Sequence, residues 1–464
     1  MRNAKESASL APTVLGPTIK QRAAAGKALR AKVPRRSHAG WKPRPERPDP
    51  IELLRHSDNA KLTELLPIRY ARMQASPFGF FRGAAAVMAS DLSATPATAL
   101  RVQACGDCHV GNFGGFGSPE RRLVFDINDF DETLPAPWEW DVKRLAASIV
   151  LASRELGLSE RRCADAARGT VESYREHMRD YAGMRALDVW YSHLDAEILI
   201  EEAATAASKK RWSRIEKVAK HATAEHFFPR ITDVENGRRR IIDKPPLVYH
   251  PPEISRIGKH VREMFERYRR TLPEERRVIL DRYHIVDVAR KVVGVGSVGT
   301  RCAVALLMAG KHDPLFLQFK EARASVLEAY AGKSRYDNQG ERVVTGQRML
   351  QAASDVFLGW TRDDDGRDYY FRQLRDMRMK IDLTVMSRRD WLEYVDLCGW
   401  ALARAHARTG DPARIAGYLG KSGAFDEAIE EFAVAYADQT ERDHAALVKA
   451  IRARRMPVRA STAA

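Results

Sequence analysis

Residues 294–322 read GVGSVGTRCAVALLMAGKHDPLFLQFKEA, a pattern that separates two fold classes. Gly294, Gly296 and Gly299 have the spacing G-x-G-x-x-G, which also begins dinucleotide-binding folds. Such a fold needs a helix after the glycines and an acidic residue about twenty positions further on. Here two extended apolar segments follow instead, on either side of the turn AGKHDP. The pattern therefore predicts a small antiparallel sheet with a glycine-rich turn near its start.

The second apolar segment, LFLQFKEA, places Lys320 in an otherwise apolar strand. In kinases a glycine-rich turn joins two strands, and a lysine on the third strand holds the α- and β-phosphates of ATP. We therefore expect Lys320 to bind a nucleotide. The backbone that covers the phosphates is expected to come from Gly294, Gly296, Ser297 and Gly299. Glu328 is the expected ion-pair partner of Lys320, and Glu341 is the alternative.

A second group of polar residues lies in CGDCHVGNFGG, residues 105–115, and in DFDE, residues 129–132. One interpretation is Cys-x-x-Cys-His, the spacing that attaches c-type haem; a redox cysteine pair is another. The alternative is a phosphotransferase loop, in which Asp107 orients the hydroxyl of an acceptor. Asn112 and Asp129 then supply oxygen ligands of the kind that Mg²⁺ prefers. Phosphoryl transfer accounts for more of these residues than haem attachment does.

Short apolar runs and amphipathic segments follow one another along the chain and predict an α+β fold in two lobes. We expect residues 49–275 to form a helical lobe with the catalytic and metal-binding loops, and residues 276–380 to form a β-rich nucleotide-binding lobe. Residues 381–455 are expected to be helices that pack with the helical lobe. Residues 1–48 carry 12 Lys and Arg but only two Glu, which predicts a disordered basic tail. A second flexible tail is expected at residues 456–464.

The segment PFGFFRG, residues 77–83, combines aromatic side chains, two glycines and one arginine. Its phenylalanines Phe78, Phe80 and Phe81 are expected to pack in the core. The alternative for the remaining side chain is that Arg82 faces an anionic ligand.

The composition argues against several classes of protein. The sequence has no run of about 18 apolar residues and therefore predicts no membrane-spanning helix. Its first residues also lack the apolar core of a signal peptide. Five cysteines at irregular spacing do not suggest a disulfide framework. We therefore expect a cytoplasmic protein with reduced thiols. The basic tail suggests weak contact with nucleic acid or an anionic surface, and a solubilising extension is the alternative.

At GDCHVGN and NDFDETLPAPWEWDVKRLA the chain resembles the protein-kinase-like superfamily, especially its aminoglycoside and choline phosphotransferase branch. The resemblance implies that Asp107 is the catalytic carboxylate and that Asn112 and Asp129 bind metal, with Asp126 as a competing alignment for Asp129. It also implies that Asp141 is a structural residue at the start of the next helix. Cys105 stands where those enzymes have His.

The order of the segments differs from that branch, because its glycine-rich lobe comes first and here it comes second. The resemblance therefore implies a circularly permuted, two-lobed kinase-like fold. In this arrangement the segment RQL, residues 372–374, is the hinge between the lobes and contributes Gln373 to the nucleotide site.

From about residue 50 to 455 the chain also resembles a bacterial family known as domain of unknown function 2252. The segments that carry this resemblance are SPFGFFRG, GDCHVGNFG, GVGSVGTR, QFKEA and YYFRQLRDMR. The kinase-like resemblance implies an ATP- and Mg²⁺-dependent phosphotransferase acting on an unidentified hydroxyl acceptor. Two alternatives remain open: nucleotide binding without phosphoryl transfer, and transfer of AMP instead of phosphate.

Overall fold

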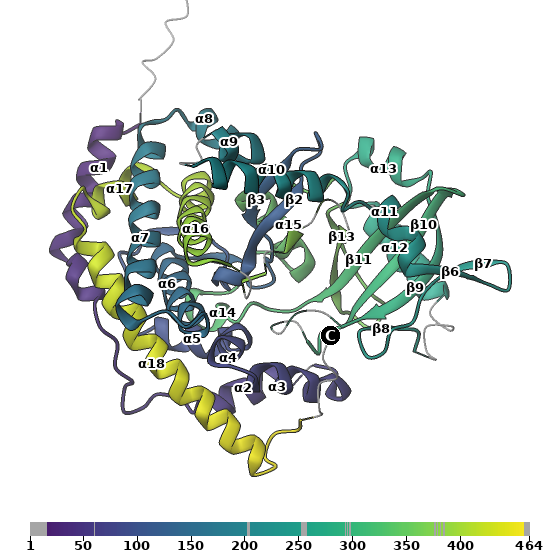
Figure 1. The fold of residues 1–464 in the computed structure, drawn as a ribbon, viewed down its shortest axis with the longest axis horizontal. Coiled ribbons are helices and arrows are strands. Elements are labelled where there is room, and N and C mark those ends of the chain that lie inside the picture. Colours follow the sequence, from purple (N-terminus) through teal and green to yellow (C-terminus); the bar gives the residue numbers. More distant parts are fainter. Residues whose placement is uncertain are drawn as a thin grey trace, which may run out of the picture.

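The computed structural model describes residues 16–59, 61–201, 205–251, 258–292, 294, 296, 298–374, 377, 379–380, 382–383 and 386–458. Figure 1 shows a helical part on the left of the view and a part built around a larger sheet on the right. The sheets are antiparallel and the helices pack around them, which confirms the expected α+β class.

The larger sheet has six strands in the order β12-β13-β11-β10-β9-β8. The meander predicted on both sides of the glycine-rich turn is present, because β9, β10 and β11 are consecutive antiparallel neighbours. Apolar side chains cover both faces: Leu307 and Leu317 pack against α12, and Leu306 and Phe316 pack against α11. The strands are β8 (Val248–Tyr249), β9 (His284–Lys291), β10 (Cys302–Gly310), β11 (Asp313–Ala322), β12 (Gly359–Arg362) and β13 (Asp368–Gln373). Around them lie α11 (Ala224–Ile231), β6 (Thr232–Glu235), β7 (Arg238–Ile241), α12 (Gly258–Arg269), α13 (Glu274–Leu280), α14 (Glu328–Ala331) and α15 (Gln339–Leu350).

The helical part is organised around α6 (Trp138–Glu155), which is buried along almost its whole length. It packs against α7 (Glu160–Gly183), α16 (Arg388–Thr409) and α18 (Ala424–Arg452). The remaining helices are α1 (Ile19–Ala28), α2 (Pro50–Asp58), α3 (Leu66–Gln74), α4 (Pro77–Gly83), α5 (Ala85–Leu92), α8 (Ala186–Tyr191), α9 (Ala196–Glu201), α10 (Ala206–Lys220) and α17 (Pro412–Leu419). Single 3₁₀ turns are η1 (Leu29–Ala31), η2 (Arg35–His38), η3 (Thr63–Leu65) and η4 (Val110–Asn112).

Two small sheets hold the acidic loops between the two parts of the molecule. One pairs β1 (Arg101–Ala104) with β4 (Leu134–Pro137). The other has the order β14-β2-β3-β5, with β14 (Met379–Lys380), β2 (Phe113–Gly117), β3 (Leu123–Ile127) and β5 (Leu194–Asp195). Residues 105–112 connect β1 to β2, and residues 128–133 connect β3 to β4. The polar segments singled out in the sequence are therefore adjacent loops.

The expected disorder of residues 1–48 is wrong from residue 16 onward; residues 1–15 lie outside the described residues. Helix α1 packs closely on α17. Arg30 and Arg35 donate hydrogen bonds to the last carbonyls of α17, at 2.7–2.8 Å. Arg47 lies between the carboxylates of Asp91 and Asp443. These three arginines are therefore matched by acceptors far away in the sequence, and composition alone does not show that.

At the other end, residues 456–458 are described and Met456 is buried, while residues 459–464 of the expected flexible tail lie outside the described residues. None of the helices in the described ranges combines the length and the apolar character that crossing a membrane requires.

Candidate active site

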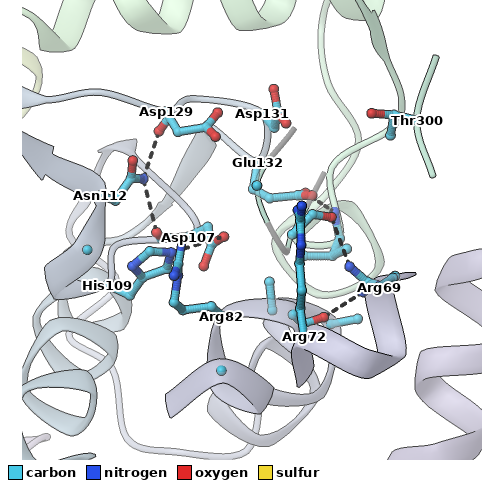
Figure 2. A pocket seen from close by; sticks show the side chains of 18 of the residues that line it. Arg69, Arg72, Arg82, Asp107, His109, Asn112, Asp129, Asp131, Glu132 and Thr300 are labelled. Atoms are coloured by element: carbon cyan, nitrogen blue, oxygen red, sulfur yellow. Dashed lines mark hydrogen bonds and ion pairs between the residues drawn. The ribbon is translucent and has the colours of Figure 1, made fainter. Parts of the chain in front are cut away.

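The glycine-rich turn and the acidic loops line the same cavity, which has a volume of about 1530 Å³. Figure 2 shows Asp129 and Asp131 in the upper part of this pocket, with Asp107, His109 and Arg82 in the lower part. The segments that form the cavity are distant in the sequence and meet only through the fold. Six of the predicted site residues are in its walls: Asp107, Asn112, Asp129, Gly294, Gly296 and Lys320.

The other predicted residues are placed differently. Ser297 lies outside the described residues. Gly299 is next to Thr300, which lines the cavity, whereas Gln373 and Glu328 are not among the described lining residues. Gln373 lies at the end of β13, and its backbone N–H donates to the carboxylate of Asp355. Its neighbours Arg372 and Leu374 reach the cavity wall instead.

The glycine-rich turn lies next to the loop that carries Asp107 and is held there by hydrogen bonds from another segment of the chain. The Arg69 guanidinium donates to the carbonyl of Gly296 at 3.0 Å, and the N–H of Leu62 donates to the carbonyl of Gly299 at 2.8 Å. A Cβ at Gly296 would lie 3.3 Å from the Arg82 carbonyl oxygen and 3.7 Å from Asp107 Oδ2. The turn therefore packs tightly on the Arg82 backbone and lies within contact distance of the Asp107 carboxylate.

Asp107 is held by a buried arginine. Arg144 on α6 donates through Nε and Nη2 to Asp107 Oδ1, the Nε bond being 2.8 Å long. The Arg144 side chain is 2% exposed, whereas that of Asp107 is 22% exposed. Burial raises the pKa of Asp107 to about 6, and the charge of Arg144 limits the rise. Since Arg144 occupies Oδ1, Oδ2 is the oxygen that lies next to the glycine-rich turn.

The loop backbone is fixed from the start of α6. Asp141 accepts hydrogen bonds from the N–H groups of Cys105 and Gly106, at 2.6 and 3.0 Å, as expected of a structural aspartate. Gly106 has φ +82°, and a Cβ there would lie 2.3 Å from the carbonyl oxygen of Glu132, so only glycine fits. Asn112 Nδ2 donates to the carbonyl oxygens of Asp107 and Asp129, at 3.3 and 3.0 Å. This amide therefore joins the two acidic loops.

The two candidate acids at the end of β3 lie in opposite surroundings. Asp126 is fully buried and receives two hydrogen bonds from Arg404, at 2.7 and 2.9 Å. Asp129 lines the cavity, and its Oδ1 is buried with no hydrogen-bond partner among the described residues. The geometry places Asp129 at the site and Asp126 in the core.

Lys320 pairs with a residue other than the predicted one. Its ammonium group forms an ion pair with Asp131, which also accepts a hydrogen bond of 2.8 Å from the Tyr370 hydroxyl. Burial disfavours the charged lysine, but the negative charges of Asp129 and Asp131 outweigh it and raise the pKa of Lys320. Glu328 instead accepts a hydrogen bond from Gln339 at 3.4 Å. The expectation that Glu328 pairs with Lys320 is therefore wrong.

Two residues of the site had no assigned role in the sequence prediction. Asp131 belongs to DFDE, but nothing local indicated a lysine partner 189 positions away. Arg144 follows Asp141 by three positions, so both lie on one face of α6. That spacing is a signal by which Arg144 could have been found.

The cysteines of the loop are poorly placed for haem attachment. Cys105 and Cys108 are free thiols with no exposed surface, whereas haem attachment needs accessible sulfur. Within the described residues, no cluster of three or more His, Cys, Asp or Glu side chains could hold a metal ion. A metal at this site would therefore need oxygen ligands from the amide of Asn112 or from a bound substrate as well as from Asp129.

The chain was compared with known protein families, curated proteins and solved structures. A family model described as "Uncharacterized protein conserved in bacteria (DUF2252)" matches residues 61–450, and the chain belongs to this family. No curated protein and no solved structure matches the chain.

Proposed function

We propose that this member of the DUF2252 family is an ATP- and Mg²⁺-dependent phosphotransferase that acts on a hydroxyl acceptor. The observation that carries the proposal is the single cavity bordered by Asp107, Asn112, Asp129, Lys320 and the glycine-rich turn. Phosphoryl transfer needs little covalent chemistry from a protein and depends on positioning and charge. These residues supply a carboxylate, oxygen ligands, a cation and a backbone turn around one space.

The residues around the cavity fit Mg²⁺ bound to a nucleotide. Asp129 Oδ1 is a buried oxygen without a partner among the described residues, and Asn112 adjoins it. Mg²⁺ usually takes one or two protein carboxylates together with phosphate oxygens and water. Asn112 and Asp129 would hold the ion, which neutralises charge on the phosphates. A site of this kind does not require three protein acids.

The roles of the chain's own residues follow from their positions. Lys320 and the backbone at Gly294 and Gly296 would bind the phosphates of ATP. The acceptor oxygen bonds to the γ-phosphorus as the bond from that phosphorus to the β–γ bridging oxygen breaks, and ADP leaves. Asp107 Oδ2 orients the acceptor hydroxyl and receives its proton.

The order of elements also supports a permuted kinase-like arrangement as part of this proposal. The larger sheet presents the glycine-rich turn between β9 and β10, Lys320 on β11, and then α15 against β12 and β13. Helix α16 returns to the acidic loops, where His406 contacts the Asp141 carboxylate at 3.3 Å. In the resembling enzymes the helix after the hinge leads into the catalytic loop, and here it lies beside that loop.

The pairing of Asp107 with Arg144 supports a second candidate function, which is nucleotide binding without transfer. An arginine bound to one oxygen of a carboxylate weakens its affinity for a proton, and here it opposes the rise in the pKa of Asp107 that burial causes. AMP transfer would use the same nucleotide site.

Nucleotide binding can be tested by unfolding the protein with and without Mg-ATP. At one hundred times its dissociation constant, a ligand stabilises the folded state by about 2.7 kcal/mol. Lys320→Met should abolish this stabilisation and also destabilise the chain, because Asp131 loses its cation. The double variant with Asp131→Asn should recover stability but not nucleotide binding. No response of the native chain to Mg-ATP would refute the proposal.

Transfer is tested separately with Asp107→Asn. We expect this variant to keep the stabilisation by Mg-ATP and to lose formation of ADP in the presence of a panel of hydroxyl compounds. Undiminished ADP formation would exclude Asp107 from the reaction. A native chain that binds Mg-ATP but never forms ADP would favour the non-transferring function.

A further inference from the structure

The cavity extends beyond Asp107 into an end formed by α3, α4, α5 and the last turns of α6. Small side chains, including Ala75, Ala85 and Ala152, leave space there. Arg72 and Arg82 are also in this wall, and Figure 2 shows Arg82 beside His109 and Asp107. The end therefore combines free volume with positive charge next to the proposed catalytic carboxylate.

The side chain of Arg82 has a buried hydrogen-bond donor that lacks an acceptor in the part of the chain that the structure describes. Its Nε is buried and has no hydrogen-bond partner among the described residues. Its guanidinium lies 5.9 Å from the centre of the Phe78 ring, a contact that provides no hydrogen-bond acceptor for Nε. Buried donors without partners are uncommon because burial removes their hydrogen bonds to water without replacement. A ligand in the cavity would supply the missing acceptor.

The nearby acids do not fill this role. Burial lowers the pKa of Arg82, and the negative charges of Asp107, Glu155 and Asp129 oppose that effect. Asp107 already binds Arg144, and Glu155 Oε1 accepts the N–H of Phe78 at 3.1 Å.

Arg72 adds a second positive charge to the same wall. Burial lowers the pKa of Arg72, and the charge of Arg82 lowers it further. The two guanidinium groups therefore lie close enough to repel one another. An oxyanion would relieve this repulsion and would accept the paired hydrogen bonds that guanidinium groups make.

We propose that the acceptor is a hydroxyl compound bearing an oxyanion, a phosphate or a carboxylate, which binds to Arg82 beside Arg72. This inference rests on the proposed function, since it names the substrate class of the same site. This oxyanion site is separate from the proposed ATP site. Lys320, the proposed ATP-binding cation, is paired with Asp131, and Asp131 lies on the opposite side of the pocket from Arg82. The acceptor's anionic group would thus hold its hydroxyl near Asp107 Oδ2.

The test uses inorganic phosphate and malonate as probes, titrated by thermal unfolding into the chain saturated with Mg²⁺ and a non-hydrolysable ATP analogue. We expect phosphate to stabilise this complex further, and Arg82→Gln to weaken the phosphate response at least about tenfold. Lys291→Gln removes a positive charge from another wall of the cavity and should leave the response intact. A response to malonate as well assigns a general oxyanion site, and a response to phosphate alone assigns a phosphorylated acceptor.

The proposal is overturned if neither probe stabilises the native complex, or if Arg82→Gln and Lys291→Gln weaken the response equally. An unchanged response of Arg82→Gln to the nucleotide analogue shows that the variant is folded. Failure of the nucleotide proposal alone would give a different result. The ATP analogue would then not stabilise the native chain. Phosphate would still stabilise the native chain and the Lys320→Met variant, but it would not stabilise Arg82→Gln.

Discussion

Replacing Asp126 and Asp129 separately by Asn should have opposite consequences, although the two residues are three positions apart. Asp126 is the only carboxylate described within hydrogen-bond distance of the fully buried Arg404. It also accepts the N–H groups of Ile127 and Ala352, each at 2.9 Å. Asp126→Asn removes the negative charge and leaves the guanidinium uncompensated in the core. Breaking a buried pair from one side costs about 3–5 kcal/mol.

Asp129→Asn removes a carboxylate that faces other acids across the cavity. The negative charge of Asp129 contributes to the raised pKa of Asp107, so its removal relieves repulsion. The same charge also stabilises the ammonium form of Lys320, so the two effects oppose each other and the free energy of unfolding should change little. The stabilisation by Mg-ATP should be lost, because the proposed metal ligand is gone.

Urea unfolding of both variants, with and without Mg-ATP, measures the two effects together. The expected result is a less stable Asp126→Asn variant that still responds to Mg-ATP, and a stable Asp129→Asn variant that does not. A loss of less than about 1 kcal/mol for Asp126→Asn would contradict the buried pair, since such a value is typical of an exposed one. A Mg-ATP response that survives Asp129→Asn would remove this residue from the metal site.

Three further outcomes are expected. ADP formation should rise with pH through about 6, where Asp107 becomes a carboxylate. Because its pKa in the folded chain exceeds the ordinary 3.8, its contribution to stability should fall as the pH rises from the ordinary value to about 6, and neither change should occur in Asp107→Asn. Gly417→Ala should destabilise the contact of α1 with α17 by about 1–3 kcal/mol in urea unfolding, because its Cβ would lie 2.1 Å from the Ala23 carbonyl oxygen, whereas Gly169→Ala, with open space, should be neutral or stabilising. Arg47→Met should cost about 3–5 kcal/mol by the same assay, since it leaves two buried carboxylates without their cation; a cost near zero would contradict this.

The parts of the fold that were predictable are those with a local signal. The glycine-rich turn and its flanking strands form a meander because apolar runs of strand length surround residues that favour turns. Asn112 lies near Asp107 because only five positions separate them in a loop between two strands. The short turn at Asn236 and Gly237 has the positive φ angles that an Asn-Gly pair favours.

The contacts that were not predictable join residues distant in sequence. The partner of Lys320 was sought at Glu328, eight positions away, whereas the fold brings Asp131 to it from another loop. Residues 16–48 were expected to be disordered because they are basic, yet Arg47 meets Asp443, 396 positions later. The composition of a segment gives its net charge but does not show which distant residues will form ion pairs with it.

The Asp107–Arg144 pair bears most directly on whether the site can react. Arg144 holds Oδ1 and so fixes the direction of the other oxygen, and a fixed orientation is what a positioning carboxylate requires. Burial then raises the pKa of Asp107 while Arg144 limits the rise, so that it lies at about 6. His109 Nε2 is 3.9 Å from Oδ2, but burial and then the charges of Arg82 and Arg144 keep its pKa well below the ordinary value. The imidazole is therefore neutral and does not compete as a cation for Oδ2. At neutral pH Asp107 is an oriented carboxylate with one oxygen toward the cavity, so the pairing with Arg144 is compatible with proton transfer from an acceptor.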